Sequence, residues 1–361
     1  MNILVIHASA GAGHQKAAEA LGAALQAIYP NQSVCRDALD YTSRLFKQLY
    51  RRTYSFCISR VPWLWGILFY ILDVPLLQPG IRVLRRIQNH AQARLLELYL
   101  IEEQFNCIFS THFFPIEVAA HLKRKGKIAA KIICVITDYD VHRIWLAEGV
   151  DLYAVACHET KEKLISLGVP DEKIRVTGIP VHEKFSYHYD IGALKKQLVM
   201  KENVFTVLIA TGSFGIGPIE KVIDKLKGVQ SLVVCGHNKK LFERLTRQNR
   251  DLVKIFGLVD NMHELMAVSD CMITKPGGLS ITEALVRQLP LIFFNAIPGQ
   301  ETNNVKVLRQ HGIGISDCSL DTIAREIQRL STSHDAFMTV VKKTQSLAHP
   351  DAVKEIIGLL P

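Results

Sequence analysis

The stretch that decides the fold is residues 3–21, ILVIHASAGAGHQKAAEAL, near the start of a chain of 361 residues. Its first five residues, Ile3 to His7, form a short apolar run typical of a buried strand. A glycine-containing turn follows at 8–14, and the alanine-rich residues 15–28 favour a helix. A strand, a glycine turn and a helix in this order predict the opening of a doubly wound α/β domain.

The same alternation of apolar runs and helix-length segments continues along most of the chain. Runs without polar alternation predict parallel strands that are covered on both faces. At about 150 residues per domain, the length predicts two domains, which we place at 1–190 and 191–339 with a linker around 187–193. A cleft between two such domains is the expected ligand site. The further expected strands are 107–110, 132–136, 152–156, 206–210, 231–235, 253–256, 271–273 and 291–294.

The positive charge of the chain is concentrated in one segment. The formal net charge is +9 at pH 7, with 43 Lys and Arg against 34 Asp and Glu. Residues 41–95 contain nine basic residues and one acid, Asp73, so a net charge of +8 falls in this segment. The protein is therefore near neutral with one basic region, in a helical insertion of the first half. Because an apolar run interrupts these charges, a nucleic-acid binder is disfavoured.

That apolar run is VPWLWGILFYIL at 61–72, with Asp73 and Pro75 closing it. Its 12 residues are fewer than the roughly 20 of a membrane-spanning helix. Two interpretations stay open. Trp63, Trp65 and Phe69 can lie in a membrane interface, with Arg51, Arg52, Arg85 and Arg86 contacting anionic phosphates. Alternatively, the run is an ordinary buried helix with solvated flanks.

The eight cysteines contain no C-x-x-C pair, so neither a zinc site nor a redox dithiol is predicted. Several lie in or beside apolar runs, which indicates reduced, buried thiols in a cytoplasmic protein. Residues 1–7 lead directly into a strand without a basic region or cleavage site, so no secretory signal is expected.

His14 stands where the first glycine turn meets the helix. It can act as a general base, donate a hydrogen bond to a substrate, or simply cap the helix while facing solvent. A helix N-terminus lowers imidazole basicity, which keeps a neutral ring available to accept a proton. A dinucleotide fingerprint requires glycine where Lys16 stands, so NAD binding is rejected.

The second half contains two more glycine turns between a strand and a helix. TGSFGIG at 211–217 lacks the Lys-Ser/Thr of an ATPase phosphate loop, so it predicts diphosphate binding by backbone N–H groups without ATP hydrolysis. TKPGGLSITEA at 274–284 places Glu283 to accept from ribose hydroxyls, and PGQETNN at 298–304 can reach sugar hydroxyls. Each segment alone is also ordinary turn chemistry. Together, at one end of one parallel sheet, they favour a nucleotide-diphosphate site.

These segments together resemble the processive diacylglycerol glycosyltransferases, which include bacterial glucosyl enzymes and plant monogalactosyldiacylglycerol synthases and are related more distantly to the MurG-type transferases. TKPGG followed by TEA is closer to the bacterial glucosyl branch. The resemblance covers nearly the whole chain. It rests on SAGAGHQKAAEAL at 9–21, ITDYDVHRIW at 136–145, GSFGIGPIE at 212–220, TKPGGLSITEAL at 274–285 and IPGQETNN at 297–304.

The resemblance implies the GT-B fold class, α/β with two doubly wound Rossmann-like domains facing a central cleft. The C-terminal half then binds a UDP-sugar, the N-terminal half binds the lipid acceptor, and a final helix at about 340–361 crosses back to the first half. One departure is the loop at 211–213, where relatives often have glycine at the positions of Thr211 and Ser213. The donor residues implied are Gly212, Ser213, Gly215, Gly217, Lys275, Gly277, Gly278 and Leu279 for the diphosphate, Gly257, Leu258 and Val259 for uracil, Glu283 for ribose, and Gln300 and Glu301 for the sugar or ribose.

On the acceptor side, the resemblance implies a catalytic role for His14, with Gly13 beside it. Asp138-Tyr139-Asp140 has the D-x-D form that holds a metal in single-domain glycosyltransferases. Here it belongs to the half opposite the phosphate turns, so we expect a catalytic or acceptor-orienting Asp138 near His142 and Trp145, and no metal. A simple strand-end cap stays open as the alternative.

The sequence therefore predicts an inverting hexosyltransferase that uses a UDP-sugar, glucose favoured, without a cofactor or metal. The acceptor is diacylglycerol or a glycosyl-diacylglycerol, and the enzyme is peripheral on the inner face of an anionic cell membrane. The first rival is a UDP-N-acetylglucosamine 2-epimerase, which needs no lipid. The second is a non-catalytic protein that senses UDP-sugars.

Overall fold

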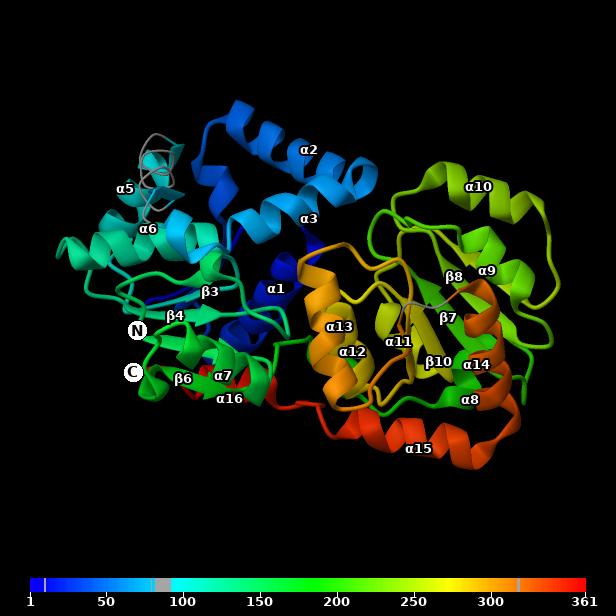
Figure 1. Ribbon diagram of the computed structural model, residues 1–361. Coiled ribbons are helices and arrows are strands. Elements are labelled where there is room, and N and C mark those ends of the chain that lie inside the picture. The colour runs from blue at the N-terminus through cyan, green and yellow to red at the C-terminus, as the bar shows by residue number, and fades with distance from the viewer. Residues whose placement is uncertain (10, 79, 82–91, 317–318) are drawn as a thin grey trace. The chain divides into compact units, whose positions relative to one another are not determined.

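The structure, a computed structural model, describes residues 1–9, 11–78, 80–81, 92–316 and 319–361 (Figure 1). Contacts within the chain divide it into two compact units. Unit 1 contains Met1–His182, Ile297–Asn303 and His349–Pro361. Unit 2 contains Glu183–Ala296 and Asn304–Ala348. The segment 297–303 therefore groups with the first half of the chain, although it follows the last strand of the second.

Unit 1 is built on a parallel sheet with the strand order β2-β1-β3-β4-β5-β6. Every pair of neighbours in this sheet is parallel. The strands are β1 (Ile3–His7), β2 (Ser33–Asp37), β3 (Cys107–Ser110), β4 (Lys131–Val135), β5 (Leu152–Val155) and β6 (Ile174–Val176). The helices are α1 (Ala12–Ile28), α2 (Arg44–Arg60), α3 (Pro62–Ile71), α5 (Arg94–Glu103), α6 (Phe113–Arg124), α7 (His158–Ser166) and α16 (Ala352–Ile357).

The burial of both faces of β1 explains why its sequence shows no polar alternation. Ile3 and Val5 pack in one core cluster with residues of α1 and α16, such as Leu21. Leu4 and Ile6 point to the other face, into a second cluster that includes residues of α5 and α6. Because helices cover both faces of the sheet, all of these positions must be apolar.

Unit 2 is built on a second parallel sheet with the order β11-β10-β7-β8-β9. In Figure 1, α14 lies beside α9 at one side of this unit, and the two helices share a core cluster with β7. The strands are β7 (Thr206–Ala210), β8 (Gln230–Val234), β9 (Val253–Phe256), β10 (Cys271–Thr274) and β11 (Leu291–Phe293). The helices are α8 (Ile191–Gln197), α9 (Ile219–Lys225), α10 (Lys239–Arg247), α11 (Met262–Ala267), α12 (Gly278–Val286), α14 (Leu320–Thr332) and α15 (His334–Gln345), and α13 (Gln300–Gln310) begins in the segment that groups with unit 1.

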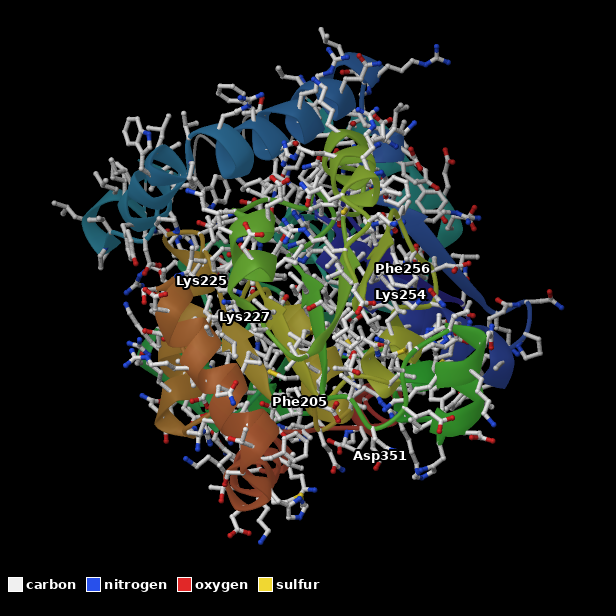
Figure 2. All side chains as sticks on the ribbon, turned by 90° about the vertical axis from the view of Figure 1, so that its right-hand side faces the viewer. Phe205, Lys225, Lys227, Lys254, Phe256 and Asp351 are labelled. Atoms are coloured by element: carbon white, nitrogen blue, oxygen red, sulfur yellow. The ribbon has the colours of Figure 1, made fainter. Side chains whose placement is uncertain are left out.

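The edge strand β9 is less buried than the centre of its sheet. Figure 2 labels Lys254 and Phe256, which lie two residues apart on the edge strand β9. None of the four residues of β9 is fully buried, whereas the central strand β7 is buried throughout. The prediction of two parallel α/β sheets is confirmed, and each of the nine expected strands is present within one residue of its expected bounds.

Candidate functional site

His14 lies on α1, three residues after Gly11, the residue that precedes the helix. Its Nδ1 atom is 2.8 Å from the carbonyl oxygen of Thr111 and 2.8 Å from the hydroxyl of Thr137. The hydroxyl of Thr111 in turn donates to the carbonyl of His14 at 2.8 Å. Since Thr111 follows β3 and Thr137 follows β4, the ring is held at the carboxyl ends of neighbouring strands.

These contacts determine the tautomer of the ring. A carbonyl oxygen only accepts hydrogen bonds, so Nδ1 carries the proton that it donates to Thr111. The other nitrogen, Nε2, then has a free lone pair on a neutral ring. Burial lowers the pKa of His14 from its usual 6.5 to about 4, against the opposing effect of the Thr111 hydrogen bond. The ring is therefore an unprotonated base at neutral pH.

Aromatic side chains surround this imidazole. The ring of His112 meets it edge-on at a centroid distance of 4.8 Å, and the ring of Trp145 lies 5.9 Å away. Trp145 is buried, and Phe113 packs edge-on against it. His14 and Trp145 are therefore neighbours in unit 1.

The D-x-D aspartates have different partners. Asp138 is buried, and one of its carboxylate oxygens accepts from the side-chain amide of Gln300 at 2.6 Å. Asp140 accepts from Lys163 at 2.6 and 2.7 Å and from the amide of Asn303 at 2.9 Å. The two carboxylates thus organise the segment 297–303 as part of unit 1. Within the described ranges, no group of three His, Cys, Asp or Glu is placed to hold a metal ion.

Helix α3 is bound to this segment through two glycines. A Cβ atom on Gly66 would lie 2.6 Å from Cβ of Pro298, closer than real contacts allow. Gly299 has a φ of +94°, and a Cβ atom there would lie 2.8 Å from the ring of Phe69. Only glycine lets the helix and the loop approach this closely.

The C-terminal end of α3 is held by the loop that carries the aspartates. His142 donates from Nε2 to the carbonyl of Phe69 at 2.9 Å, while its Nδ1 accepts from the backbone of Ile144 at 3.0 Å. Asp73, just after the helix, accepts from the backbone N–H of Arg143 at 3.1 Å. His142 therefore satisfies one of the carbonyls that every helix end leaves unpaired.

The other face of α3 is exposed and apolar, and the exposed side of α2 combines apolar and basic side chains. Within α3 only Gly66 is buried, and Trp63 is 61% exposed. The buried-helix interpretation of residues 61–72 is therefore wrong. The large hydrophobic residues exposed between 45 and 77 are Leu45, Leu49, Phe56, Trp63, Leu64, Ile67, Leu68, Tyr70, Ile71, Val74, Leu76 and Leu77, which we call the apolar surface.

Arg51 and Arg52, on α2, are exposed beside the apolar surface, whereas Arg85 and Arg86 lie outside the described residues. Among the residues that the structure describes, no single helix combines the length and apolar composition needed to cross a membrane. The pair 44–58 and 62–73 meets that test together, with a bend of 109° between its helices.

In unit 2, the glycine turn after β7 is tightly folded. Gly215 and Gly217 have φ values of +51° and +127°, and Ser213 accepts from the backbone of His237 at 2.8 Å. Thr211 is buried, and within the described part of the chain its hydroxyl has no hydrogen-bond partner. A buried hydroxyl without a partner is costly, so it is suited to a ligand oxygen.

The second glycine turn of unit 2 lies on the neighbouring strand. The hydroxyl of Thr274 donates to the carbonyl of Ala210 at 2.7 Å, which joins the carboxyl ends of β10 and β7. Gly277 precedes α12 without a side-chain cap, and a Cβ atom there would meet nothing within 4 Å. Lys275 is buried at the same strand end, and Glu283 is half-buried on α12.

The structure therefore places the predicted residues in two groups. Unit 1 contains His14, Gly13, Asp138, His142 and Trp145 together with Gln300 and Glu301, which the sequence had associated with the donor sugar. Unit 2 contains the other donor residues, which are Gly212, Ser213, Gly215, Gly217, Lys275, Gly277, Gly278, Leu279 and Glu283 at the ends of β7 and β10, with Gly257, exposed Leu258 and Val259 after β9.

The partners of His14 were not predicted from the sequence. Thr111 and Thr137 each follow a predicted strand closely, at 107–110 and 132–136. A hydroxyl at the carboxyl end of a parallel strand is the signal that would have identified them.

We predict that His14 titrates near pH 4 rather than near its usual 6.5. Because the folded state disfavours the charged ring, the contribution to stability is complete above about pH 6.5 and is lost as the pH falls toward 4. Nitrogen NMR of histidine-labelled protein, assigned with His14→Gln, will report the tautomer and the midpoint. A midpoint near 6.5, or a proton on Nε2 in the neutral ring, would contradict this description.

We predict that Gly66→Ala loosens the segment 297–303, because the added methyl overlaps Pro298. Overpacking costs about 1–3 kcal/mol, although alanine is the better helix former. Hydrogen exchange should be faster at the amides of Gly299, Thr302 and Asn303, which are hydrogen-bonded within the segment. Gly192→Ala, on an exposed position of α8, is the matched control and should change nothing. Equal exchange in both variants would show that the helix does not hold the loop.

Each half of the chain matches the model of a known protein family. The family model of monogalactosyldiacylglycerol (MGDG) synthase matches residues 14–181, and that of the glycosyltransferase family 28 C-terminal domain matches 206–356. A processive diacylglycerol beta-glucosyltransferase of Bacillus cereus (strain B4264) is 35% identical over 63% of this chain and 60% of its own length. Another, of Bacillus cereus (strain AH187), is 30% identical over 73% of this chain and 70% of its own length. The chain thus spans less than two thirds of the first of these relatives.

Solved structures resemble the chain in fold. They include MurG of Acinetobacter baumannii (TM-score 0.61, 12% identity, 99% of both chains) and Anabaena Alr3699/HepE in complex with UDP-glucose (0.58, 14%, 100% and 99%). UDP-GlcNAc 2-epimerase from Neisseria meningitidis, bound to UDP-GlcNAc, has a TM-score of 0.62 at 12% identity over 99% of both chains. The predicted GT-B fold class is confirmed. The chain belongs to the family of processive diacylglycerol glycosyltransferases and monogalactosyldiacylglycerol synthases.

Proposed function

We propose that this protein transfers a hexose, glucose favoured, from a UDP-sugar to a hydroxyl of diacylglycerol or glycosyl-diacylglycerol, with inversion. The reaction takes place at the cytoplasmic face of the membrane. The observation that carries the proposal is the neutral His14, whose Nε2 is free to accept a proton, in a unit that also exposes the apolar surface. The family of the chain and the phosphate-suited turns of unit 2 support it.

In this mechanism, His14 Nε2 removes the proton of the acceptor hydroxyl as its oxygen attacks the anomeric carbon of the sugar. Single displacement breaks the bond to UDP on the opposite side and inverts that carbon. Asp138 is the weaker candidate for the base, since it already accepts from Gln300. We assign it the orientation of the segment 297–303 and of the acceptor.

Unit 2 supplies the stabilisation of the leaving UDP in this proposal. The backbone N–H groups after β7 and at the start of α12 can donate to the diphosphate, and Lys275 adds a positive charge. We assign Glu283 to the ribose and the residues after β9 to uracil. We propose that no metal or cofactor is needed, because these groups already oppose the developing negative charge.

The apolar surface is proposed to dock on an anionic membrane. Exposed aromatic and aliphatic side chains suit the headgroup boundary, and the neighbouring arginines suit anionic phosphates. Figure 2 shows side chains projecting outward from the blue ribbon of α2 and α3. An exposed apolar surface of this extent favours a membrane or protein contact over solvent.

The epimerase is the second candidate, because the fold resembles that of the Neisseria meningitidis enzyme as well as that of MurG. It predicts conversion of UDP-N-acetylglucosamine in the absence of lipid. Epimerisation of a soluble nucleotide sugar does not require the apolar surface, so we prefer a transferase with a lipid acceptor.

We predict that the purified protein releases UDP from a UDP-hexose only with diacylglycerol vesicles. General-base catalysis contributes about 10²–10⁴-fold, so His14→Ala should lower the rate at least 100-fold while the affinity for UDP stays unchanged. His334→Ala, at an exposed position of helix α15, is the matched control and should retain full activity. A wild-type protein that releases no UDP from any UDP-hexose would contradict the proposed function.

We predict that Arg51→Gln with Arg52→Gln weakens binding to anionic vesicles about tenfold or more, since each basic residue near such a surface contributes about 1 kcal/mol. High salt should remove the difference. Adding substitutions of Arg85 and Arg86 should deepen the loss while UDP binding is spared. Lys239→Gln with Lys240→Gln, two adjacent exposed charges of unit 2, is the control. Unchanged vesicle binding in the arginine variant would exclude electrostatic docking here.

A further inference from the structure

Tyr54, on α2, lies on the inner face of the α2–α3 pair, opposite the apolar surface. Its ring meets Trp65 of α3 edge-on, at a centroid distance of 5.6 Å and an interplanar angle of 88°. Tyr54 and Trp65 are half-buried, whereas Phe56 and Trp63 are exposed on the other side. The two tryptophans of α3 therefore lie on different faces, with Trp63 exposed on the apolar surface and Trp65 on the inner face.

The hydroxyl of Tyr54 approaches the glycine turn that leads into α1. A Cβ atom on Gly11 would lie 3.3 Å from the Tyr54 hydroxyl oxygen and 3.5 Å from its Cε1 atom. Gly11 precedes the helix that carries His14. Because Gly11 has no side chain, the Tyr54 hydroxyl can lie close to the turn that leads to His14.

The Tyr54 hydroxyl is a hydrogen-bond donor that lies near two carboxylates. Burial raises the pKa of Tyr54 well above its usual value, and the charges of Glu301 and Asp138 raise it further. The phenol therefore keeps its proton at any physiological pH. Both carboxylates belong to unit 1, so they are part of the same compact body as Tyr54.

Among the residues that the structure describes, none accepts a hydrogen bond from the Tyr54 hydroxyl. Within the described residues, the structure gives the Tyr54 hydroxyl no hydrogen-bond partner, although it gives one to the hydroxyls of Tyr153, Tyr187 and Tyr189. The Tyr54 side chain is half-buried, and its hydroxyl oxygen is not among the fully buried unpaired atoms of the described residues, so a ligand can reach it. A polar atom kept at this position is explained by a ligand that accepts from it.

We propose that Tyr54 is an acceptor-binding residue, whose hydroxyl donates to an oxygen in the polar head of the glycerolipid. This inference rests on the proposed function and assigns it a residue on the membrane-docking helices. The acyl chains of the lipid remain with the apolar surface, while its glycerol or sugar oxygens reach the inner face. Membrane docking and recognition of the polar head are then performed by opposite faces of the same two helices.

The test compares Tyr54→Phe with Tyr29→Phe. Tyr29 follows α1, is also half-buried, and its hydroxyl has no hydrogen-bond partner in the described part of the chain. We expect Tyr54→Phe to raise the KM for diacylglycerol in vesicles about tenfold, the effect of one lost hydrogen bond. The KM for the UDP-sugar, vesicle binding and thermal stability should not change. Tyr29→Phe should match the wild type throughout.

Calorimetric titration with dioctanoylglycerol provides a readout that does not need turnover. The dissociation constant should rise about tenfold in Tyr54→Phe and stay unchanged in Tyr29→Phe. If Tyr54→Phe is active and has the wild-type KM and dissociation constant for the lipid, the inference is overturned and the proposed function is unaffected. A change only in the KM for the UDP-sugar would have the same meaning. A wild-type protein that neither binds dioctanoylglycerol nor releases UDP would overturn both.

Discussion

The hydrogen bond from His14 Nδ1 to the carbonyl of Thr111 is the interaction on which the chemistry of unit 1 depends. Together with the Thr137 hydroxyl, it joins the ends of β1, β3 and β4 around one imidazole. A neutral ring has a single N–H, so its placement on Nδ1 makes Nε2 the base. The desolvation that packing imposes then keeps this base unprotonated at neutral pH.

A second constraint is the close approach of α3 to the segment 297–303. Gly66 and Gly299 permit contacts with Pro298 and Phe69 that no other residue allows. The same segment supplies the amides that hold Asp138 and Asp140. A helix with an exposed apolar face is therefore joined through its inner face to the loops that carry the carboxylates. The insertion that contains α3 therefore contacts the loops of the candidate site through one face and is exposed on the other.

Much of the fold follows from the sequence, because buried parallel strands are continuous apolar runs bounded by glycine turns. Two strands were missed, and both are at sheet edges. β2 contains Arg36 and Asp37, and β6 has only three residues, so neither shows an apolar run. Polar side chains are tolerated there because an edge strand is less completely covered than a central one.

The candidate site was predictable where residues stand in a strand-end turn, as at His14 and Asp138. It was not predictable where residues are brought together by packing between segments that are far apart in the sequence. The partners of His14 come from residues about 100 positions away, and the proximity of Tyr54 to Gly11 depends on how α2 packs. The grouping of Gln300 with unit 1 likewise depends on its amide reaching Asp138, 162 residues earlier in the chain. Such contacts have no signature in local spacing.

Mass spectrometry of the lipid product shows whether this protein glycosylates diacylglycerol. Anionic vesicles that contain diacylglycerol would be incubated with the purified protein and each of several UDP-hexoses. We expect diacylglycerol to gain the mass of one or more hexose residues, with UDP-glucose the best donor. Unmodified diacylglycerol with every donor, or conversion of UDP-N-acetylglucosamine without any glycosylated lipid, would contradict it.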